Sequence, residues 1–321
     1  MKPILDKKYI KKSIKKATTI LHRGELVIFP TETVYGIGAN ATNPTAIQRI
    51  YKIKNRPFDN PLICHFQNLQ KIKDNFEMNE VANKLAEYFW PGPITLILKK
   101  KNSSTICGNV SNNKELVGCR IPNNSIANEI LKSVPFPIAA PSANISTKLS
   151  PTNIKHLDKK IKDKVFFIDG GDSHFGLEST VINVSSNHPK ILRYGSVTAE
   201  QIKKIIPKIY FFKQKYSSQL SPGQQFKHYS PNIPLRINVK KVLEGEALLN
   251  FGRNNLKSKV YELNLSHSSD LNEAGKNLYN YLHQLDKYEY KGIAVAPIPN
   301  NDLGITINDR LNRAIANDSK D

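Results

Sequence analysis

The chain has 321 residues, 39% of them hydrophobic, and its 47 Lys and Arg against 27 Asp and Glu give a formal net charge of +20. This length is sufficient for a sizeable core and favours two domains. No segment approaches about 20 consecutive apolar residues, which excludes a membrane-spanning helix. The three scattered cysteines exclude a disulfide framework or a Cys-x-x-Cys zinc site. We therefore expect a soluble globular protein in the reducing cytoplasm.

The N-terminal segment lacks the continuous apolar run of a secretion signal, and Ile10, Ile14 and Ile20 follow helical spacing. It is interpreted as a first helix, with an amphipathic transit peptide as the alternative. Gly24–Phe29 then indicates a buried strand, and the polar stretch "FPTETVYGIGANAT" of residues 29–42 follows directly. Its hydroxyls and glycines would let the backbone approach a small ligand at the end of a strand. The alternative interpretation is an ordinary glycine turn.

Apolar strands alternate with amphipathic helices as far as about residue 205. The expected strands are 26–29, 61–66, 94–98, 116–121, 136–140, 165–169, 179–184 and 190–194. Helices are expected at Asn43–Lys54, which begins with an asparagine cap and a proline, at Asn79–Trp90, and at Thr198–Ile206, which has capping-box spacing. This pattern predicts an α/β fold with a large mixed twisted sheet and packed helices.

Three parts of the chain are expected: a large α/β domain at residues 1–206, a linker at 207–233 and a small Rossmann-like α/β domain at 234–321. The linker is rich in Ser, Gln, Pro and aromatic residues. Its aromatic residues around "SPGQQFKHYSP" are unexpected in a merely flexible connection, so we expect an ordered lid over the first domain. Simple docking of the two domains is the alternative.

Two cations, Lys54 and Arg56, end the first clear helix. They form either a favourable interaction with the helix dipole or a site for phosphate or carboxylate oxygens, with both ends accessible to solvent. His65 faces the opposite side of its strand from Cys64 and is either a ligand group or a satisfied half-buried histidine. Ser142 and Asn144 would share one face of a strand.

Several familiar site types are absent from the sequence. Acidic residues are dispersed and no His-x-x-x-His pair accompanies them, so no metal ligands are assigned. The chain has neither a Walker loop nor Gly-x-Gly-x-x-Gly, and no serine lies in a Gly-x-Ser-x-Gly elbow. The positive charge would suit nucleic acid, but the lysines are spread along the whole chain, so only weak RNA binding is expected.

The motifs "PTETVYGIGANA", "IYKIKNRPFDNPL", "WPGPITLIL", "CRIPNN", "APSANIS", "GLESTVINV" and "ILRYGSV" occur in this order. Together they resemble the YrdC-type L-threonylcarbamoyladenylate synthases, and the motif "SPGQQFKHYSP" before a small α/β domain resembles the long, two-domain form. The resemblance is strong as far as Val197 and at the linker, and weak after Pro234.

The resemblance implies a nucleotidyltransferase that condenses L-threonine, bicarbonate and ATP to threonylcarbamoyl-AMP and pyrophosphate, with Mg²⁺ held mainly by the ATP phosphates. A separate transferase would then use the product to modify tRNA next to the anticodon. The family pattern implies catalytic roles for Lys54, Arg56, Ser142 and Asn144. It implies threonine binding by Thr33, His65, Arg120, Ala140 and Ser179, with a forked bond from Arg120 to the threonine carboxylate. It implies ATP binding by Arg56, Asn60, Leu116, Ser142, Ser150, Arg193 and Tyr229.

Two alternatives remain at this point. Carbamoyltransferases that form a carbamoyl-adenylate share a related domain, but they are much longer chains with cysteine-rich zinc modules. A non-enzymatic RNA-binding module would use the basic surface alone. The candidate site is rich in cations and hydroxyls and shows no strong side-chain base, which suits a reaction in which two anions must be aligned.

Overall fold

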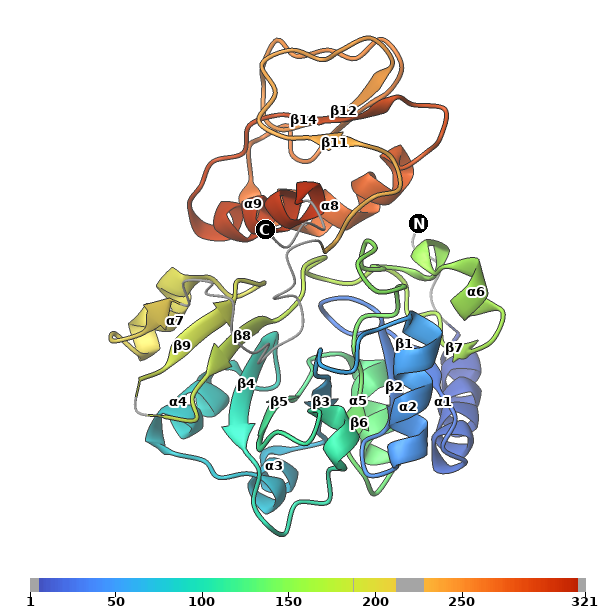
Figure 1. Cartoon of the computed structure of the whole chain (residues 1–321), viewed down its shortest axis with the longest axis vertical. Coiled ribbons are helices and arrows are strands. Elements are labelled where there is room, and N and C mark those ends of the chain that lie inside the picture. Colours follow the sequence, from blue (N-terminus) through green and yellow to red (C-terminus); the bar gives the residue numbers. More distant parts are fainter. Residues whose placement is uncertain (1–5, 187, 212–227, 317–321) are drawn as a thin grey trace.

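The computed structural model describes residues 6–186, 188–211 and 228–316. It contains a ten-stranded mixed sheet and a separate four-stranded sheet. We call the part of the chain up to Phe211 the N-terminal unit and the part from Pro234 onward the C-terminal unit. Figure 1 shows the C-terminal unit stacked on the N-terminal unit, with its two helices facing the larger sheet. Among the described residues, no helix has the length and apolar character needed to cross a membrane.

The N-terminal unit holds ten strands and seven α-helices among the residues that the structure describes. The helices are α1 (Lys7–His22), α2 (Pro44–Lys54), α3 (Leu69–Asn75), α4 (Glu80–Phe89), α5 (Ser125–Lys132), α6 (Lys159–Lys162) and α7 (Ala199–Ile205). The strands are β1 (Val27–Phe29), β2 (Gly36–Asn40), β3 (Ile63–His65), β4 (Ile94–Lys99), β5 (Leu116–Arg120), β6 (Ile138–Ala139), β7 (Phe166–Phe167), β8 (Thr180–Asn183), β9 (Lys190–Arg193) and β10 (Tyr210–Phe211). Short 3₁₀ turns η1 (Gly108–Val110) and η2 (Ile154–His156) complete the unit.

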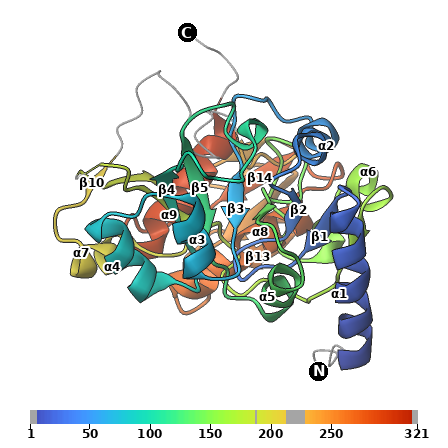
Figure 2. The ribbon, with the colours of Figure 1, turned by 90° about the horizontal axis from the view of Figure 1, so that it is seen from below.

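The large sheet has the strand order β10-β9-β8-β4-β5-β3-β6-β2-β1-β7 and mixes parallel with antiparallel pairs, as expected from the sequence. β1 pairs antiparallel with β2, while its other edge pairs parallel with β7, where Val27 is opposite Phe166. Side chains alternate across the sheet, so that Ile28 packs in one hydrophobic cluster, whereas Val27 and Phe29 pack in another. Helix α1 covers the second cluster and packs against α5 (Figure 2).

Helix α2 begins and ends where its sequence indicates. The side chain of Asn43 accepts a hydrogen bond from the backbone N–H of Ala46, Pro44 occupies the first turn, and Asn55 ends the helix in the left-handed conformation with φ of 49°. Most apolar residues of α2 are buried, and so is Lys54 in its last turn. These caps therefore place Lys54 and Arg56 on the two sides of a sharp change in chain direction.

The four-stranded sheet of the C-terminal unit is parallel throughout, with the order β11-β14-β12-β13. Its elements are β11 (Leu235–Arg236), β12 (Glu246–Asn250), β13 (Glu262–Asn264), α8 (Leu271–Leu285), β14 (Gly292–Val295) and α9 (Asp302–Ile315). Helices α8 and α9 pack against each other and lie between this sheet and the N-terminal unit (Figure 1). This arrangement matches the small α/β unit expected from the sequence.

Three differences from the sequence expectations appear in the described residues. The glycine-rich stretch after β1 forms the buried strand β2, because Gly38 leaves space for the ring of Phe29. Helices α3, α5 and α6 were not expected, although Asn68 and Asn124 cap the first two with their side chains. Strand β10 extends the large sheet to Phe211, beyond the expected boundary at residue 206. The expected lid falls largely in residues 212–227, which lie outside the described residues.

The two units meet through apolar and polar contacts. Leu177 packs into the core of the C-terminal unit, where Gly275 leaves room for it. The imidazole rings of His156 and His283 stack at 4.2 Å between centroids, and His283 Nε2 lies 3.2 Å from the carbonyl oxygen of Ser150. Burial lowers the pKa of His156 to about 4 and that of His283 to about 3, with the charge on His156 acting further on His283. Both rings are therefore neutral at pH 7.

This stacked pair predicts a stability that falls in mild acid. Each histidine has a lower pKa in the folded than in the unfolded state, so the unfolded state binds more protons below pH 6.5. Because both rings are partly exposed, we expect a loss of about 1 kcal/mol in unfolding free energy for each ring between pH 6.5 and 5. Urea unfolding across this range should show a shallower pH slope in His283→Gln, which keeps a donor toward Ser150. An equal slope in the variant would contradict the prediction.

Candidate active site

Most of the side chains that the sequence assigned to substrates line one small cavity at the junction of the two units. The members from the sequence expectation are Thr33, Arg56, His65, Arg120, Ala140, Ser142, Ser179, Arg193 and Tyr229. They leave a free volume of about 50 Å³, well below the roughly 300–1,000 Å³ typical of small-molecule pockets. These side chains therefore surround a space with little free volume.

Lys54 lies beneath this cavity and does not line it. Its side chain is 1% exposed, and its ammonium group donates hydrogen bonds to the carbonyl oxygens of Ser142 and Asn144 and to the Asn144 side chain. Burial lowers the pKa of Lys54 well below its usual value, and the charge of Arg56 acts in the same direction. Three oxygen acceptors nevertheless favour the ammonium form. The expected accessibility of this lysine to solvent is therefore wrong, and its contacts hold the Ser142–Asn144 loop.

Arg56 lines the cavity and is also buried. Its Nε donates to the carbonyl oxygen of Asn60 at 3.0 Å, and its Nη2 donates to the Asn60 side chain and to the carbonyl oxygen of Pro61. Burial lowers the pKa of Arg56 to about 10, so the guanidinium stays charged at pH 7. Asn60 thus holds one side of the guanidinium and contributes to the site through Arg56.

Arg120, at the end of β5, forms a buried ion pair with Glu32 in which Nη2 and Oε1 are 2.6 Å apart. Its Nη1 donates to the hydroxyl of Thr33 at 3.0 Å, and its Nε donates to the carbonyl oxygen of Gly92. The second carboxylate oxygen of Glu32 has no hydrogen-bond partner among the described residues. A forked bond from Arg120 to a ligand carboxylate therefore requires the ion pair with Glu32 to rearrange.

His65 and Ser179 form part of the polar wall of the cavity. Burial, followed by the charge of Arg120, lowers the pKa of His65 to about 3, so its ring is neutral, and its Nδ1 has no partner in the described part of the chain. The hydroxyl of Ser179 contacts Thr95 at 2.8 Å and accepts a hydrogen bond from Arg193 Nη2 at 3.1 Å. These two side chains can therefore form hydrogen bonds with a ligand, but neither is a strong base.

Glu178 connects the cavity to the C-terminal unit. Its Oε1 accepts a hydrogen bond from Ser150 at 2.6 Å, and its Oε2 accepts from Tyr279 at 3.1 Å and from Arg310 Nε at 2.8 Å. Burial alone would raise the pKa of Glu178, but the charges of Arg310 and Arg193 outweigh this effect and hold the pKa below its usual value. Glu178 is therefore an ionised member of the cavity wall.

Tyr229 closes the cavity. It adopts the left-handed conformation with φ of 63°, which is uncommon for a bulky residue, and its side chain is 2% exposed. Its hydroxyl has no hydrogen-bond partner among the described residues. Together with His228, which is also buried, it fills the side of the cavity that faces the C-terminal unit.

The structure separates the sequence candidates into groups. Lys54, Asn60 and Asn144 contact lining residues, and Ser150 reaches the cavity through Glu178. Leu116 lies at the other end of β5 from Arg120 and packs on Ile97, Val181 and Leu192, so its contact with ATP stays a prediction. Sequence reasoning missed three polar lining residues, namely Thr31, Glu178 and His228. Each of the three lies inside one of the motifs quoted above, and no other signal in the sequence indicated it.

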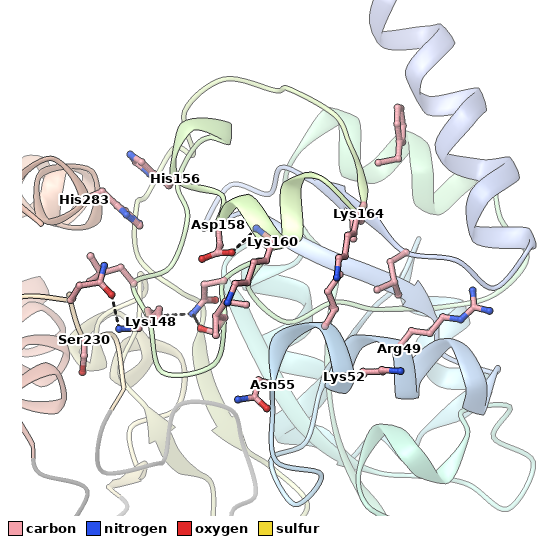
Figure 3. A pocket seen from close by; sticks show the side chains of 18 of the residues that line it. Arg49, Lys52, Asn55, Lys148, His156, Asp158, Lys160, Lys164, Ser230 and His283 are labelled. Atoms are coloured by element: carbon pink, nitrogen blue, oxygen red, sulfur yellow. Dashed lines mark hydrogen bonds between the residues drawn. The ribbon is translucent and has the colours of Figure 1, made fainter. Parts of the chain in front are cut away.

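A larger cavity of about 980 Å³ lies behind the Ser142–Asn144 loop, between α2, the α6 region and the C-terminal unit (Figure 3). Figure 3 shows Arg49 and Lys52 on α2 and Lys160 and Lys164 across the cavity from them. It shares Asn144 with the candidate site but contains none of the other side chains assigned to substrates. Its basic lining is separate from the chemistry described above.

No group of three or more His, Cys, Asp or Glu side chains that could hold a metal ion occurs in the described residues. The two carboxylates nearest the cavity, Glu32 and Glu178, are each paired with an arginine. A divalent cation at this site would therefore take its ligands mainly from phosphate oxygens and water, as Mg²⁺ commonly does.

Comparisons with known proteins agree along the whole chain. Residues 19–195 match the Sua5/YciO/YrdC family, described as "Telomere recombination", and residues 197–316 match "Threonylcarbamoyl-AMP synthase, C-terminal domain". The threonylcarbamoyl-AMP synthase of Bacillus subtilis is 34% identical, over 94% of this chain and 92% of that protein. A putative threonylcarbamoyl-AMP synthase of Methanocaldococcus jannaschii is 36% identical, over 56% of this chain and 84% of its own length.

A solved structure shows the same arrangement of both units. The crystal structure of P. abyssi Sua5 complexed with L-threonine superposes with a TM-score of 0.86 at 32% identity and covers 94% of each chain. The chain therefore belongs to the Sua5/YciO/YrdC family, in the long form that carries the threonylcarbamoyl-AMP synthase C-terminal domain.

Proposed function

We propose that this protein is an L-threonylcarbamoyladenylate synthase, which converts L-threonine, bicarbonate and ATP to threonylcarbamoyl-AMP and pyrophosphate. One observation carries the proposal: hydroxyls and cations assigned to threonine and to ATP converge on one buried cavity. Full-length similarity to a protein named threonylcarbamoyl-AMP synthase supports it. This similarity disfavours a non-enzymatic RNA-binding module and a carbamoyltransferase.

The proposed chemistry needs alignment of two anions more than it needs a base. The threonine amine and bicarbonate form a carbamate with loss of water, and a carbamate oxygen attacks the α-phosphorus of ATP while pyrophosphate leaves. Arg56 and Arg193 border the cavity and would offset the charge of the phosphates. Thr33, His65 and Ser179 would hold threonine by neutral hydrogen bonds, and Ala140 leaves room beside them.

Lys54 is proposed to act through the loop that it holds. Its ammonium group fixes the carbonyl oxygens of Ser142 and Asn144, and the Ser142 hydroxyl donates to the Asn144 side chain at 2.5 Å. The loop then presents Ser142 to the cavity in one orientation. We propose that Mg²⁺ enters with ATP and neutralises its phosphates, because the paired carboxylates at the site are poor ligands for it.

Substrate entry requires movement, because about 50 Å³ cannot hold threonine and ATP. Tyr229 and His228 fill the side of the cavity next to Ser142 and Arg193. We propose that these two residues move outward to admit ATP and return to exclude water from the mixed anhydride. The free hydroxyl of Tyr229 would then bond the nucleotide.

The division into domains, the partner enzyme and the cellular location are likewise proposed. We propose that the N-terminal unit is the catalytic domain, which β10 extends past the expected boundary at residue 206 to Phe211, and that the C-terminal unit from residue 234 is a second domain. A separate tRNA threonylcarbamoyl transferase would consume the product, and the reaction would take place in the cytoplasm. Weak RNA binding to the basic surface stays a secondary expectation.

Incubation with ATP, L-threonine, bicarbonate and Mg²⁺, followed by mass analysis, tests the function directly. Threonylcarbamoyl-AMP and pyrophosphate should appear together, and each should depend on threonine. Pyrophosphate release that does not depend on threonine, or no adenylate product, would overturn the proposal.

Arg56 and Lys54 should respond differently to substitution. Arg56→Lys keeps the charge but loses the fork held by Asn60, so we expect about a 100-fold fall in kcat/KM with a small change in melting temperature. Lys54→Met removes the ammonium that holds the Ser142–Asn144 carbonyls, so activity and melting temperature should fall together. Steady-state kinetics and thermal unfolding measure both.

Lys52→Ala is the matched control, because Lys52 lies on the same helix with its side chain exposed. It should retain normal kinetics and stability. Normal turnover in Arg56→Lys would contradict the proposed role of Arg56, and a loss of activity without a loss of stability in Lys54→Met would contradict the loop-holding role of Lys54.

The polar lining also predicts amino-acid selectivity. Serine lacks one methyl group and should be used about 10–100-fold less efficiently than threonine. Valine should be rejected more strongly, since the hydroxyls of Thr33 and Ser179 and the neutral ring of His65 would face an apolar methyl group. Competition between the three amino acids, read from the adenylate products, measures both ratios. Equal use of valine and threonine would show that these polar groups do not recognise the threonine side chain.

A further inference from the structure

Arg310 of helix α9 is buried at the back of the candidate site, although it belongs to the C-terminal unit. Its side chain is 1% exposed, which is exceptional for arginine. Its Nη2 donates to the carbonyl oxygen of Tyr194 at 2.6 Å, and its Nη1 pairs with Asp309 at 2.5 Å. The C-terminal unit therefore inserts a fixed cation behind the cavity.

The first target of this cation is Glu178. Arg310 Nε donates to Glu178 Oε2 at 2.8 Å, while Glu178 itself lines the cavity. A cavity that holds a triphosphate and a carboxylate cannot easily tolerate an uncompensated carboxylate in its wall, because like charges repel strongly in a buried site. Arg310 neutralises that wall without occupying the space that the substrates need.

The second target is Tyr229. The guanidinium carbon of Arg310 lies 4.8 Å from the centre of the Tyr229 ring, within the range of a cation–π contact. Helix α9 also holds the neighbouring residues: His228 N–H donates to the carbonyl oxygen of Arg313, and the Ser230 hydroxyl donates to that of Ala314. Helix α9 thus holds Tyr229 in its left-handed conformation at the cavity.

These contacts converge on groups assigned to ATP. Glu178 accepts a hydrogen bond from Ser150, and Ser150 and Tyr229 are both among the side chains expected to contact ATP. Both groups need support from their surroundings. Ser150 depends on its hydrogen bond to the ionised carboxylate of Glu178, and Tyr229 depends on an uncommon backbone conformation. Arg310 contacts Glu178, which holds Ser150, and it contacts the ring of Tyr229 directly.

We propose that Arg310 is a positioning residue for ATP, through which the C-terminal unit completes the nucleotide side of the active site. The proposal rests on the proposed function. It gives the C-terminal unit a direct part in the reaction, because Arg310 compensates the charge of Glu178 and holds the ring of Tyr229. Arg310 contacts no reacting atom, so its effect should appear in nucleotide binding before it appears in chemistry.

Arg310→Met tests the proposal, because methionine keeps an unbranched apolar stem without the charge. We expect the dissociation constant of a non-hydrolysable ATP analogue to rise about 10–100-fold. The KM for ATP should rise in parallel, whereas kcat and the KM for threonine should change less. Arg310→Lys keeps the charge and should restore part of the affinity.

Two controls separate positioning from simple docking of the units. Thr306→Val removes the hydrogen bond from α9 to the carbonyl oxygen of Gly195 at the same junction, without touching Glu178 or Tyr229. Arg236→Met breaks the ion pair with Glu246 elsewhere in the C-terminal unit. Both variants should bind the ATP analogue within a fewfold of the unsubstituted protein. If either weakens ATP binding as much as Arg310→Met does, the proposal is overturned.

The double variant Glu178→Gln/Arg310→Met removes both charges of the buried pair. Replacing both members of such a pair is commonly far less harmful than removing one, so affinity should lie between those of Arg310→Met and the unsubstituted protein. If Arg310→Met does not fold, the double variant is used for the test instead. The double variant also lacks the cation–π contact with Tyr229, so full affinity for the ATP analogue in it would overturn the proposal. Binding of the ATP analogue does not depend on product formation, so failure of the synthase assay and failure of this proposal are distinguishable.

Discussion

The ammonium group of Lys54 is buried, and carbonyl oxygens of the Ser142–Asn144 loop compensate its charge. Moving this group would leave a cation and several carbonyl oxygens unpaired in the interior, which is costly. Helix α2, through its caps, and the loop after β6 are therefore fixed relative to each other. The position of Ser142 in the cavity follows from this contact, and so does the direction in which the chain carries Arg56.

The same principle operates on both sides of the cavity. Glu32 pairs with Arg120 at the end of β5, and Glu178 pairs with Arg310 on the side of the C-terminal unit. Each acid thereby loses its repulsion toward an anionic substrate, while the neighbouring hydroxyls of Thr33 and Ser150 stay oriented by the paired groups. Glu178 is thus a carboxylate in the cavity wall whose charge is compensated, which is compatible with an anionic group bound in the same cavity.

Local patterns were sufficient for most strands of the large sheet and for helices α2, α4 and α7, because apolar periodicity and caps are visible in a few adjacent residues. They missed α3 and α5 although an asparagine caps each, and the residues that line the cavity came from the resemblance of the motifs to a known family. They were insufficient for Lys54, since lysine is almost always exposed and its acceptors are main-chain oxygens far along the chain. Arg310 carried no signal either, because Glu178 and Tyr229 lie far from it in sequence. Strand β2 was missed because its small residues resemble a turn.

The pairing of β1 with β7 affects how the protein is made. Residue 27 lies opposite residue 166, so one edge of β1 has no partner until the ribosome has synthesised most of the N-terminal unit. At about 5–20 residues per second, that edge waits on the order of 10 s. The hairpin with β2 forms from adjacent residues and covers only the other edge. The N-terminal unit therefore depends on a pairing between residues far apart in sequence, whereas the C-terminal sheet assembles from one contiguous segment.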